Sequence, residues 1–234
     1  MTVLVDADIV GYRAAFSTEG MTPEDTEDKV DAIIEQILHA TTFDGHPYEL
    51  FLTGKGNFRK EIAVTAPYKG NRKGTTPPEF LGHARDHMVK HWGAVVSEGE
   101  EADDLISIRA TELYPHAVIA SVDKDFLQVA GTHYNTRSGE FRTVDHWEGL
   151  QFFYAQILEG DRADNIQGIY RVGPKKARKM LEGCTTEMEL YNVCVEAYDG
   201  PERVLENGRL LWLRREKGQL WDPPEDLTES DNGP

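Results

Sequence analysis

The sequence contains little cysteine and no long apolar run, and both absences limit the classes of protein that it can encode. Its 234 residues include only two cysteines, Cys184 and Cys194, whose spacing does not suggest a zinc site. No run approaches the ~18 consecutive apolar residues of a membrane-spanning helix. The first residues, MTVLVDADIV, lack the basic start and the cleavage site of a signal peptide. We therefore expect a soluble, cytoplasmic protein with buried, reduced thiols and no membrane contact.

The chain also lacks the excess of positive charge that is typical of proteins that bind nucleic acid. Its 25 Lys and Arg stand against 41 Asp and Glu, which gives a formal net charge of −16. The basic residues are nevertheless concentrated in two islands. Segment 55–78 holds six of them with one acid, and segment 171–179 holds five with none, while the acids gather in 19–35 and after residue 222. Because phosphate contacts come from Lys and Arg, the two islands keep nucleic-acid binding open.

Strand and helix signals alternate through the first 145 residues. Apolar runs predict buried strands at 3–6, near residue 50, at 94–96 and at 117–121. Helical patterns lie between them at 26–41, 79–92 and 102–113. Such alternation is typical of an α/β fold with a parallel sheet, whose ligands gather at the carboxyl ends of the strands.

The strand signal ends at about residue 145. Helices are predicted at 146–159, 174–182, 186–197 and 202–216, and an acidic, Pro-rich tail begins at Asp222. We therefore expect an α/β core at 1–145, which includes the basic segment 55–78, then a helical region at 146–221 and a disordered tail at 222–234.

Carboxylates from four places in the sequence are expected to converge on one site at the strand ends. They are Asp6 and Asp8, Glu101, Asp103 and Asp104, Asp123 and Asp125, and Asp161 and Asp164. Such a cluster repels itself unless it is neutralised, and protonating it at neutral pH needs large pKa shifts. Oxygen ligands without His or Cys suit Mg²⁺ or Mn²⁺. Two such ions ~4 Å apart can hold the attacking and leaving oxygens of a phosphodiester.

Taken singly, several of these acids have ordinary structural explanations. Asp8, Asp104 or Asp125 can serve as a helix cap or as a partner of the helix dipole. Asp161 and Asp164 can begin a helix after a loop. Independent caps give no reason, however, for EADD, DKD and GDxxDN to recur in this order.

In this order the motifs resemble the 5′ nucleases of the flap endonuclease class, which include phage 5′-3′ exonucleases and the 5′ nuclease domain of bacterial DNA polymerase I. The matching stretches are VLVDAD at 3–8, YKGNRK at 68–73, EADDLI at 101–106, SVDKDFLQV at 121–129 and GDRADNIQGIYRVGPKKARKML at 160–181. The resemblance implies a PIN-like parallel-sheet nuclease core and makes the nine carboxylates metal ligands. Many family members carry a non-acidic residue at the position of Asp8.

The resemblance also implies how DNA is held. The stretch GIYRVGPKKARKML looks like a helix-hairpin-helix that binds duplex phosphates through Gly168, Gly173, Lys175, Lys176 and Lys179, and that can hold a K⁺ ion. Arg171 stands where the family usually has the first hairpin glycine. YKGNRK resembles the family's arch over the active site, which makes Lys69 and Arg72 catalytic through the scissile phosphate. Arg59 and Lys73 of the same island are expected to bind DNA.

The reaction implied is hydrolysis of DNA in the 5′ to 3′ direction or at a 5′ flap, which leaves 5′-phosphates and needs no side-chain nucleophile. The substrate is duplex DNA with a 5′ end or flap, RNA–DNA hybrids remain open, and a monomer is expected. A compact chain without an attached polymerase is typical of phage or stand-alone bacterial replication enzymes.

Three other readings remain. VLVDADIV also fits the start of a haloacid-dehalogenase-like phosphatase, in which Asp6 is the nucleophile. That reading requires a strand before GDRAD, where QFFYAQILE is helical in pattern. A PIN-type ribonuclease shares the acidic sheet but gives no reason for the hairpin, and a non-catalytic DNA-binding module gives no reason for nine converging acids.

Overall fold

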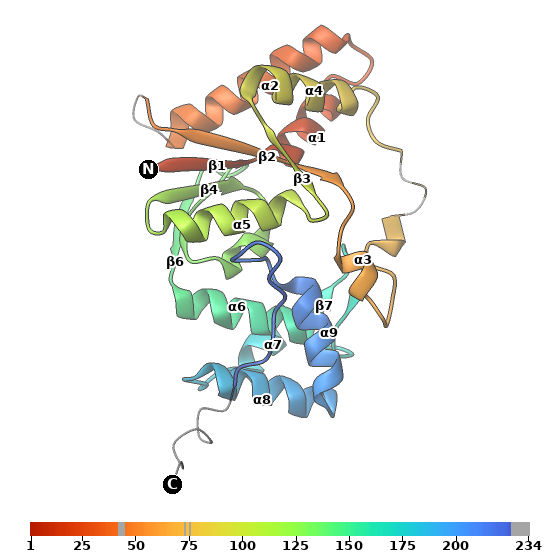
Figure 1. Ribbon diagram of the computed structural model, residues 1–234, viewed down its shortest axis with the longest axis vertical. Helices are drawn as coiled ribbons and strands as arrows, with labels where there is room; N and C mark the ends of the chain where they lie inside the picture. Colours follow the sequence, from red (N-terminus) through yellow and green to blue (C-terminus); the bar gives the residue numbers. More distant parts are fainter. Residues whose placement is uncertain (42–44, 73, 75, 226–234) are drawn as a thin grey trace. The chain divides into compact units, whose positions relative to one another are not determined.

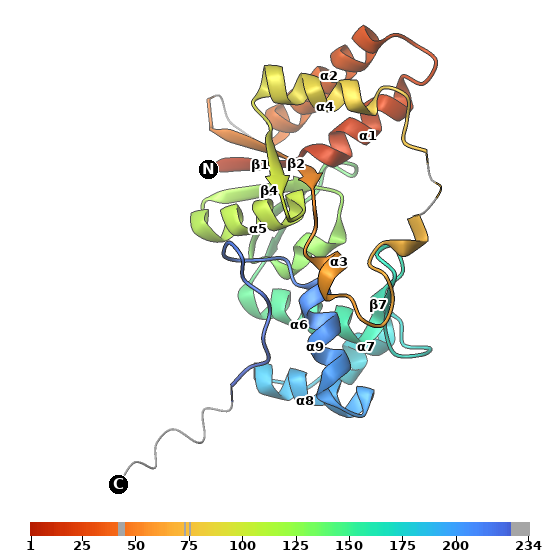
Figure 2. The ribbon, with the colours of Figure 1, turned by 45° about the vertical axis from the view of Figure 1, so that its right-hand side comes forward.

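The computed structural model describes residues 1–41, 45–72, 74 and 76–225, which form two compact units (Figures 1 and 2). Unit 1 comprises Met1–Phe58, Gly74–His146 and Leu213–Lys217, and unit 2 comprises Arg59–Lys73, Trp147–Trp212 and Gly218–Pro234. This division differs from the predicted domains in two places. Most of the basic segment 55–78 belongs to the helical unit, and residues 213–217 belong to the sheet unit. Most of the predicted tail, from residue 226 on, lies outside the described residues.

A six-stranded sheet forms the centre of unit 1, with the strand order β3-β2-β1-β4-β5-β6. Its strands are β1 Thr2–Asp6, β2 Tyr48–Lys55, β3 Val95–Glu98, β4 Ala117–Ser121, β5 Gly131–Asn135 and β6 Phe141–Val144. The first five run parallel and β6 is antiparallel to β5. The predicted mostly parallel α/β sheet is therefore confirmed. Strands β5 and β6 were not predicted, because both are half exposed and carry no apolar run.

Helices cover both faces of this sheet. They are α1 Ala7–Ser17, α2 Pro23–Thr41, α4 Leu81–Trp92 and α5 Ala102–Leu113, and a 3-10 turn, η2, spans Lys124–Gln128. In Figures 1 and 2, α1, α2 and α4 lie on one face and α5 lies on the other. The predicted helices at 26–41, 79–92 and 102–113 thus form with shifts of three residues or fewer at their ends.

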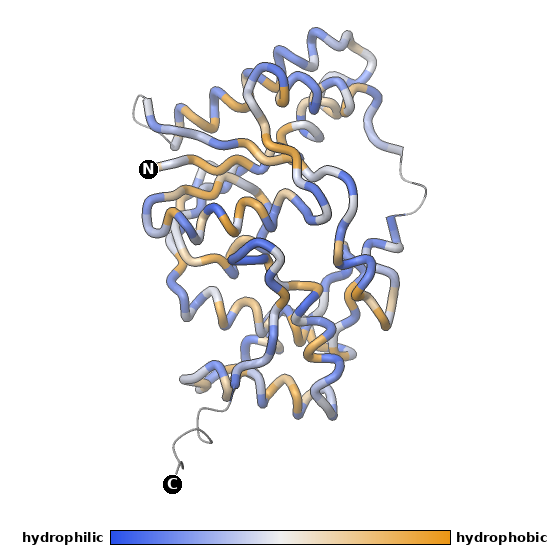
Figure 3. The backbone as a smooth tube through the Cα atoms, in the orientation of Figure 1, coloured by the Kyte–Doolittle hydropathy of each residue, from blue (hydrophilic) through white to orange (hydrophobic). Residues whose placement is uncertain are grey.

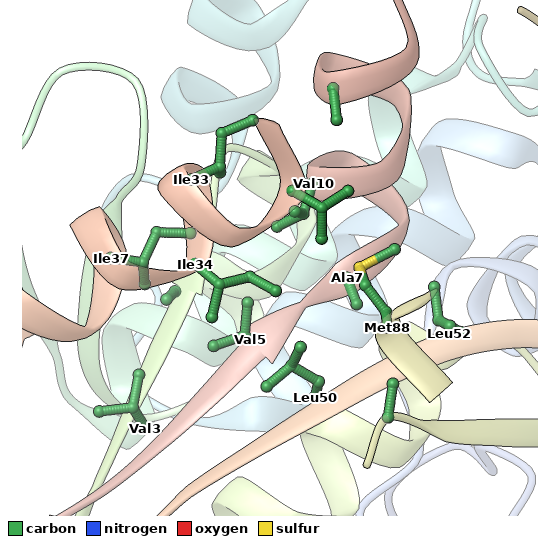
Figure 4. Close-up of a cluster of buried hydrophobic side chains, with 14 of the residues drawn as sticks. Val3, Val5, Ala7, Val10, Ile33, Ile34, Ile37, Leu50, Leu52 and Met88 are labelled. Carbon is green, nitrogen blue, oxygen red and sulfur yellow. The ribbon is translucent and has the colours of Figure 1, made fainter. Parts of the chain in front are cut away.

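The alternation of side chains along the strands builds two cores. Val3 and Val5 pack with Ile34 of α2 and Met88 of α4 on one face (Figure 4), whereas Leu4 between them packs on the opposite face with α5. Figure 3 shows apolar colour along the central strands. Because side chains of consecutive strand residues point to opposite faces, the run VLV serves both cores.

The connections reverse direction between β1 and β4. From β1 the chain proceeds to β2 and β3 on one side, and after α5 it returns to β4 beside β1 and continues to β5. In open α/β sheets, ligands bind outside the carboxyl ends of the strands at such a reversal. Asp6 ends β1 and Ser121 ends β4 at this place.

Unit 2 is mainly helical. Its elements are α3 Arg59–Ile62, the 3-10 turn η1 Gly70–Arg72, α6 His146–Glu159, β7 Gly160–Asp161, β8 Ile166–Gln167, α7 Pro174–Met180, α8 Glu187–Tyr198 and α9 Pro201–Leu211. The predicted helices form, although α9 ends at Leu211 rather than at 216. The expectation of no strand after residue 145 is wrong, since β7 and β8 pair as a two-stranded sheet. Strands of two residues are too short to give a periodic signal. No helix in the described ranges is long and apolar enough to cross a membrane.

Two glycines allow the chain to cross itself closely in unit 2. A Cβ atom on Gly168 would lie 2.2 Å from the carbonyl oxygen of Glu159 and 2.4 Å from the backbone nitrogen of Gly160. Gly160 itself has φ +69° and meets Gly168 in the same way. Gly168, predicted to bind DNA, therefore has a packing role in addition. By contrast, nothing lies within 4 Å of the Cβ position at Gly173.

Replacing Gly168 by Ala should lower the free energy of unfolding by at least about 2 kcal/mol, because the added methyl group overlaps backbone atoms that cannot turn away. Gly173→Ala should cost less than about 1 kcal/mol, the price of a weaker helix N-cap. Urea unfolding of the two variants measures the difference. Equal stabilities would mean that the β7–β8 crossing relaxes freely.

Candidate functional site

Asp6 is held at the point where the sheet order reverses. The Ser121 hydroxyl of β4 donates to Oδ2 of Asp6 at 2.7 Å, and the Ile9 backbone N–H donates to Oδ1 at 3.4 Å. Asp6 is at once the last residue of β1 and the N-cap of α1. Its carboxylate is buried, with 4% of the residue exposed.

This position makes the Asp6 carboxylate hard to ionise. Burial above all, together with the negative charges of Asp8 and Asp123, raises its pKa from 3.8 to about 7, against the lowering effect of the hydrogen bonds from Ser121 and Ile9. A carboxyl group with a pKa near 7 is only partly ionised at neutral pH, and a nearby positive charge would favour its anionic form. Asp6 is thus a group whose ionisation a bound cation would favour.

Asp8 is clamped by residues of unit 1 that the sequence analysis did not single out. Arg85 of α4 pairs with Asp8 Oδ1 and also donates to the Thr53 carbonyl oxygen. The Thr53 backbone N–H donates to Asp8 Oδ2 at 2.9 Å. Both oxygens of Asp8 therefore already have donors. No sequence signal identified Arg85, because a single Arg on a helix has many possible partners.

The EADD motif forms the first turn of α5, as predicted. Glu101 is the N-cap, and its side chain and that of Asp104 form a reciprocal capping box in which Asp104 Oδ2 accepts from the Glu101 N–H at 3.2 Å. The Ala102 N–H donates to Thr53 Oγ1 at 3.0 Å, which ties this turn to β2. Asp104 is fully buried, whereas Asp103 is partly exposed.

The DKD motif lies just beyond β4. Asp123 is exposed and accepts the Asp125 N–H at 2.9 Å, so it caps the 3-10 turn η2. The Ser121 hydroxyl that donates to Asp6 also accepts the Asp123 N–H at 3.0 Å. One serine thereby joins the acids of β1 and β4.

In unit 1 the acids that follow β1, β3 and β4 all lie beyond the carboxyl ends of strands of one parallel sheet. Their donor atoms are carboxylate oxygens alone, which suits Mg²⁺ or Mn²⁺. Among the described residues, no group of three or more His, Cys, Asp or Glu is gathered closely enough to enclose a metal ion. The donor chemistry fits a divalent ion, while the assignment of individual ligands stays a prediction.

Asp161 and Asp164 belong to unit 2, with the two residues predicted to be catalytic. Asp161 Oδ1 accepts the Ala163 N–H at 2.6 Å, and Asp164 Oδ2 accepts the Tyr68 hydroxyl at 2.7 Å. Arg72 pairs with Asp164 at 2.8 Å and the Lys69 ammonium lies 3.7 Å from it. The YKGNRK and GDRADN motifs therefore contact one another. Convergence of this pair with the seven acids of unit 1 stays a prediction.

One residue of the first basic island has a role other than the predicted one. Arg59, expected to bind DNA, is 1% exposed and donates to the carbonyl oxygens of Leu210 at 2.9 Å and Trp212 at 2.8 Å. It binds carbonyl groups at the end of α9, which a helix leaves without intrahelical partners. A buried guanidinium cannot contact a phosphate at the surface, so this expectation is wrong. Lys73 lies outside the described residues.

The second basic island is exposed. Lys175, Lys176 and Lys179 are exposed residues of α7, which Gly173 and Pro174 begin. Arg171 has φ +60°, the left-handed conformation that glycine adopts most readily. The hairpin therefore keeps a turn suited to glycine although an arginine occupies it. Its guanidinium lies over the ring of Tyr170, which is 80% exposed.

The elements around GDRAD do not fit the phosphatase hypothesis. That reading requires a strand leading into GDRAD, but α6 runs through His146–Glu159 immediately before it. The two-residue β7 that contains Asp161 pairs with β8 in a sheet separate from the one that carries Asp6. The acids of a haloacid-dehalogenase-like site are thus not supplied by one sheet.

Part of the sequence is similar to curated nucleases. No protein-family model matches the sequence. A flap endonuclease Xni of Shewanella piezotolerans is 28% identical over 163 residues, which are 62% of this chain and 64% of the relative. A 5′-3′ exonuclease of Buchnera aphidicola is 29% identical over 171 residues, 63% of this chain and 54% of the relative. The matches therefore span less than two thirds of either relative's own length.

The fold is shared with solved nuclease structures. The bacteriophage T5 D15 protein, co-crystallised with metal ions, matches with a TM-score of 0.71 at 17% identity, over 90% of this chain and 88% of that one. A complex of the T5 D15 flap endonuclease with DNA and metal ions gives a TM-score of 0.66 at 18% identity over the same shares. The chain is thus similar in sequence to a flap endonuclease and to a 5′-3′ exonuclease over part of its length, and it shares the fold of the T5 D15 structures.

Proposed function

We propose that the protein is a divalent-metal-dependent nuclease that hydrolyses DNA from a 5′ end or at a 5′ flap. The observation that carries the proposal is the set of carboxylates at the carboxyl edge of the sheet, centred on the buried Asp6 at the β1/β4 reversal. Clustered carboxylates are stabilised by a bound cation, and a bound cation can also offset the charge on a phosphodiester during hydrolysis. The named relatives and the solved complex with DNA and metal ions support the same activity.

The hydrogen bonds suggest two roles among the acids of unit 1. Asp8 is paired with Arg85, and the fully buried Asp104 accepts the backbone N–H groups of Glu101 and Arg214, so we assign these two acids to holding the frame of the site. Asp6, Asp103 and Asp123 are the residues that would hold Mg²⁺ or Mn²⁺, with Glu101 and Asp125 beside them. A divalent ion there would offset the negative charge that builds on the phosphate during hydrolysis.

The basic residues would place the substrate. Lys69 and Arg72 lie beside Asp164 on turns of unit 2. They would bind a phosphate oxygen in place of the Asp164 carboxylate. The lysines of α7 would hold the duplex backbone without reading base sequence. A K⁺ ion at the hairpin and cleavage of RNA–DNA hybrids remain part of the proposal.

Replacing Asp123 by Asn should lower single-turnover cleavage of a labelled 5′-flap DNA in Mg²⁺ by at least about 100-fold, because a carboxylate that would hold the ion becomes neutral. DNA affinity measured in Ca²⁺ should stay within about threefold of wild type. Asp86→Asn, the same change on the exposed side of α4, is the matched control. Labels at the 5′ and 3′ ends report the polarity. Near-normal cleavage by Asp123→Asn would contradict the metal site, and products that begin at the 3′ end would contradict the proposed direction.

Asp6 should make the stability of the metal-free protein depend on pH. Its folded pKa of about 7 lies above the ordinary 3.8, so its contribution is fully present below about pH 4 and is lost as the pH rises through 7. Melting temperatures in EDTA should therefore fall more for wild type than for Asp6→Asn between pH 4 and 8. Mn²⁺ at pH 8 should stabilise wild type more than the variant. If the melting temperatures of wild type and Asp6→Asn changed equally with pH, the pKa of Asp6 would not be raised in the folded protein.

The α7 lysines should contribute affinity rather than rate. Lys175→Ala/Lys176→Ala should weaken duplex binding at every sequence and reduce the slope of log affinity against log salt by about two, roughly one for each lost phosphate contact. Lys29→Ala/Lys90→Ala, which removes two exposed lysines of unit 1, is the control for net charge. An equal change of slope in both double variants would remove the hairpin from the DNA-binding surface.

A further inference from the structure

A short segment that follows α9 packs into unit 1 beside the acidic motif of α5. This return segment, Leu213–Lys217, is separated from EADD by more than 100 residues of sequence. Leu213 is buried in the core formed with α5, and its backbone N–H donates to Gln128 Oε1 at 2.9 Å. The segment is therefore anchored next to the site and is not a loose connection.

Arg214 of the return segment contacts Glu100, the residue before EADD, and Asp104, the last residue of EADD. Its Nη1 lies 2.7 Å from Glu100 Oε2, and only 11% and 6% of the two side chains are exposed. Its backbone N–H donates to Asp104 Oδ1 at 3.2 Å. Its guanidinium stacks on the ring of Phe58, with 3.7 Å from Cζ to the ring centroid. The planar side chain thus has a fixed orientation.

The groups that Arg214 binds fix the first turn of α5 in turn. Asp104 Oδ2 accepts the Glu101 N–H in the capping box, so one carboxylate joins the return segment to the N-cap. The Glu100 carbonyl oxygen accepts the Ser97 hydroxyl at 2.6 Å, and Ser97 Oγ accepts the Gly54 N–H at 3.0 Å. Glu100 is therefore held from β2 and β3 on one side and from Arg214 on the other.

The energetics favour a positioning role over a purely stabilising one. A buried ion pair often adds no more stability than well-packed apolar side chains of the same volume, because both charges lose their hydration. What it does supply is a fixed geometry and a positive charge among several carboxylates. Side chains that orient metal ligands are worth about 10- to 100-fold in metal affinity.

We propose that Arg214 is a positioning residue that sets the divalent-metal affinity of the carboxylate site by holding Glu100 and Asp104, and through them Glu101 and Asp103. The inference rests on the proposed function, since it assumes that these acids serve a metal ion. It adds a contribution from the far end of the chain to a site otherwise formed by the sheet and α5.

Arg214→Lys separates geometry from charge. Lysine keeps the positive charge but loses the planar stack on Phe58 and the fork that fixes Glu100. Arg109→Lys is the matched control, because Arg109 lies on α5 itself and pairs with the carboxylates of Glu49 and Glu112 near the other end of the helix. Both variants lose a guanidinium ion pair of unit 1, and only the Arg214–Glu100 pair lies next to EADD.

The test is Mn²⁺ binding to the full chain without DNA, measured by calorimetry, together with the Mn²⁺ dependence of flap cleavage. Arg214→Lys should weaken Mn²⁺ binding by about 10-fold and raise the Mn²⁺ concentration for half-maximal cleavage equally. The rate at saturating Mn²⁺ should return to within about threefold of wild type, and Arg109→Lys should leave both quantities unchanged. If Arg214→Lys does not fold, Phe58→Leu, which removes only the stack, should weaken Mn²⁺ binding in the same direction.

Each outcome decides between the two proposals. If wild type binds Mn²⁺ and cleaves DNA, but Arg214→Lys or Phe58→Leu has wild-type Mn²⁺ affinity, Arg214 is a structural residue only and the nuclease assignment stands. If Arg109→Lys weakens Mn²⁺ binding as much as Arg214→Lys, the effect is general destabilisation and the positioning role is overturned. If wild type neither binds Mn²⁺ nor cleaves, the proposed function fails and this inference fails with it.

Discussion

The gathering of negative charge at one edge of a buried sheet is the constraint on which the rest of unit 1 depends. The order of the strands places the ends of β1 and β4 side by side, and both are followed by acids. Asp6, the most deeply placed of the site acids on these strands, has its pKa raised to about 7 by burial and by its acidic neighbours. A fold that only needed stability would replace it by an apolar residue.

Positive and hydrogen-bond-donating groups of the protein itself offset part of this negative charge. Arg85 pairs with Asp8, Arg214 pairs with Glu100, and backbone N–H groups bind Asp8, Asp104 and Asp6. These donors fix the rim of the site. They leave Asp6 without a cationic partner among the causes of its pKa shift, where two like charges and burial outweigh two hydrogen bonds. The internal cations thus lie around the site, and the position of Asp6 is the one at which a divalent ion would gain most.

Local sequence signals predicted the parts of the fold in which local and tertiary preferences agree. The run VLV and the pattern of α5 predicted a buried strand and a helix because burial on both sheet faces demands apolar residues. The half-exposed β5 and β6 escaped prediction, since their pairing is imposed by the sheet edge rather than by their own composition. The EADD and DKD motifs lie at the predicted helix start and strand end. The partners of Arg59 and Arg85 could not be predicted in this way, because they lie in segments that are distant in the sequence and come close only in the fold.

Four non-glycine residues of unit 2 have positive φ among the described residues; one of them, Asp199, ends α8, and the other three lie in the motifs singled out in the sequence. Lys69, Asn165 and Arg171 all have positive φ, and all lie in YKGNRK, GDRADN or the hairpin. A non-glycine residue in this conformation costs on the order of 1 kcal/mol, which glycine would avoid. At Arg171 and Lys69 the strained position carries a positive charge that glycine cannot provide. Stability alone does not explain a charged residue in either of these turns, whereas under the proposed function each cation would lie where it can contact a phosphate.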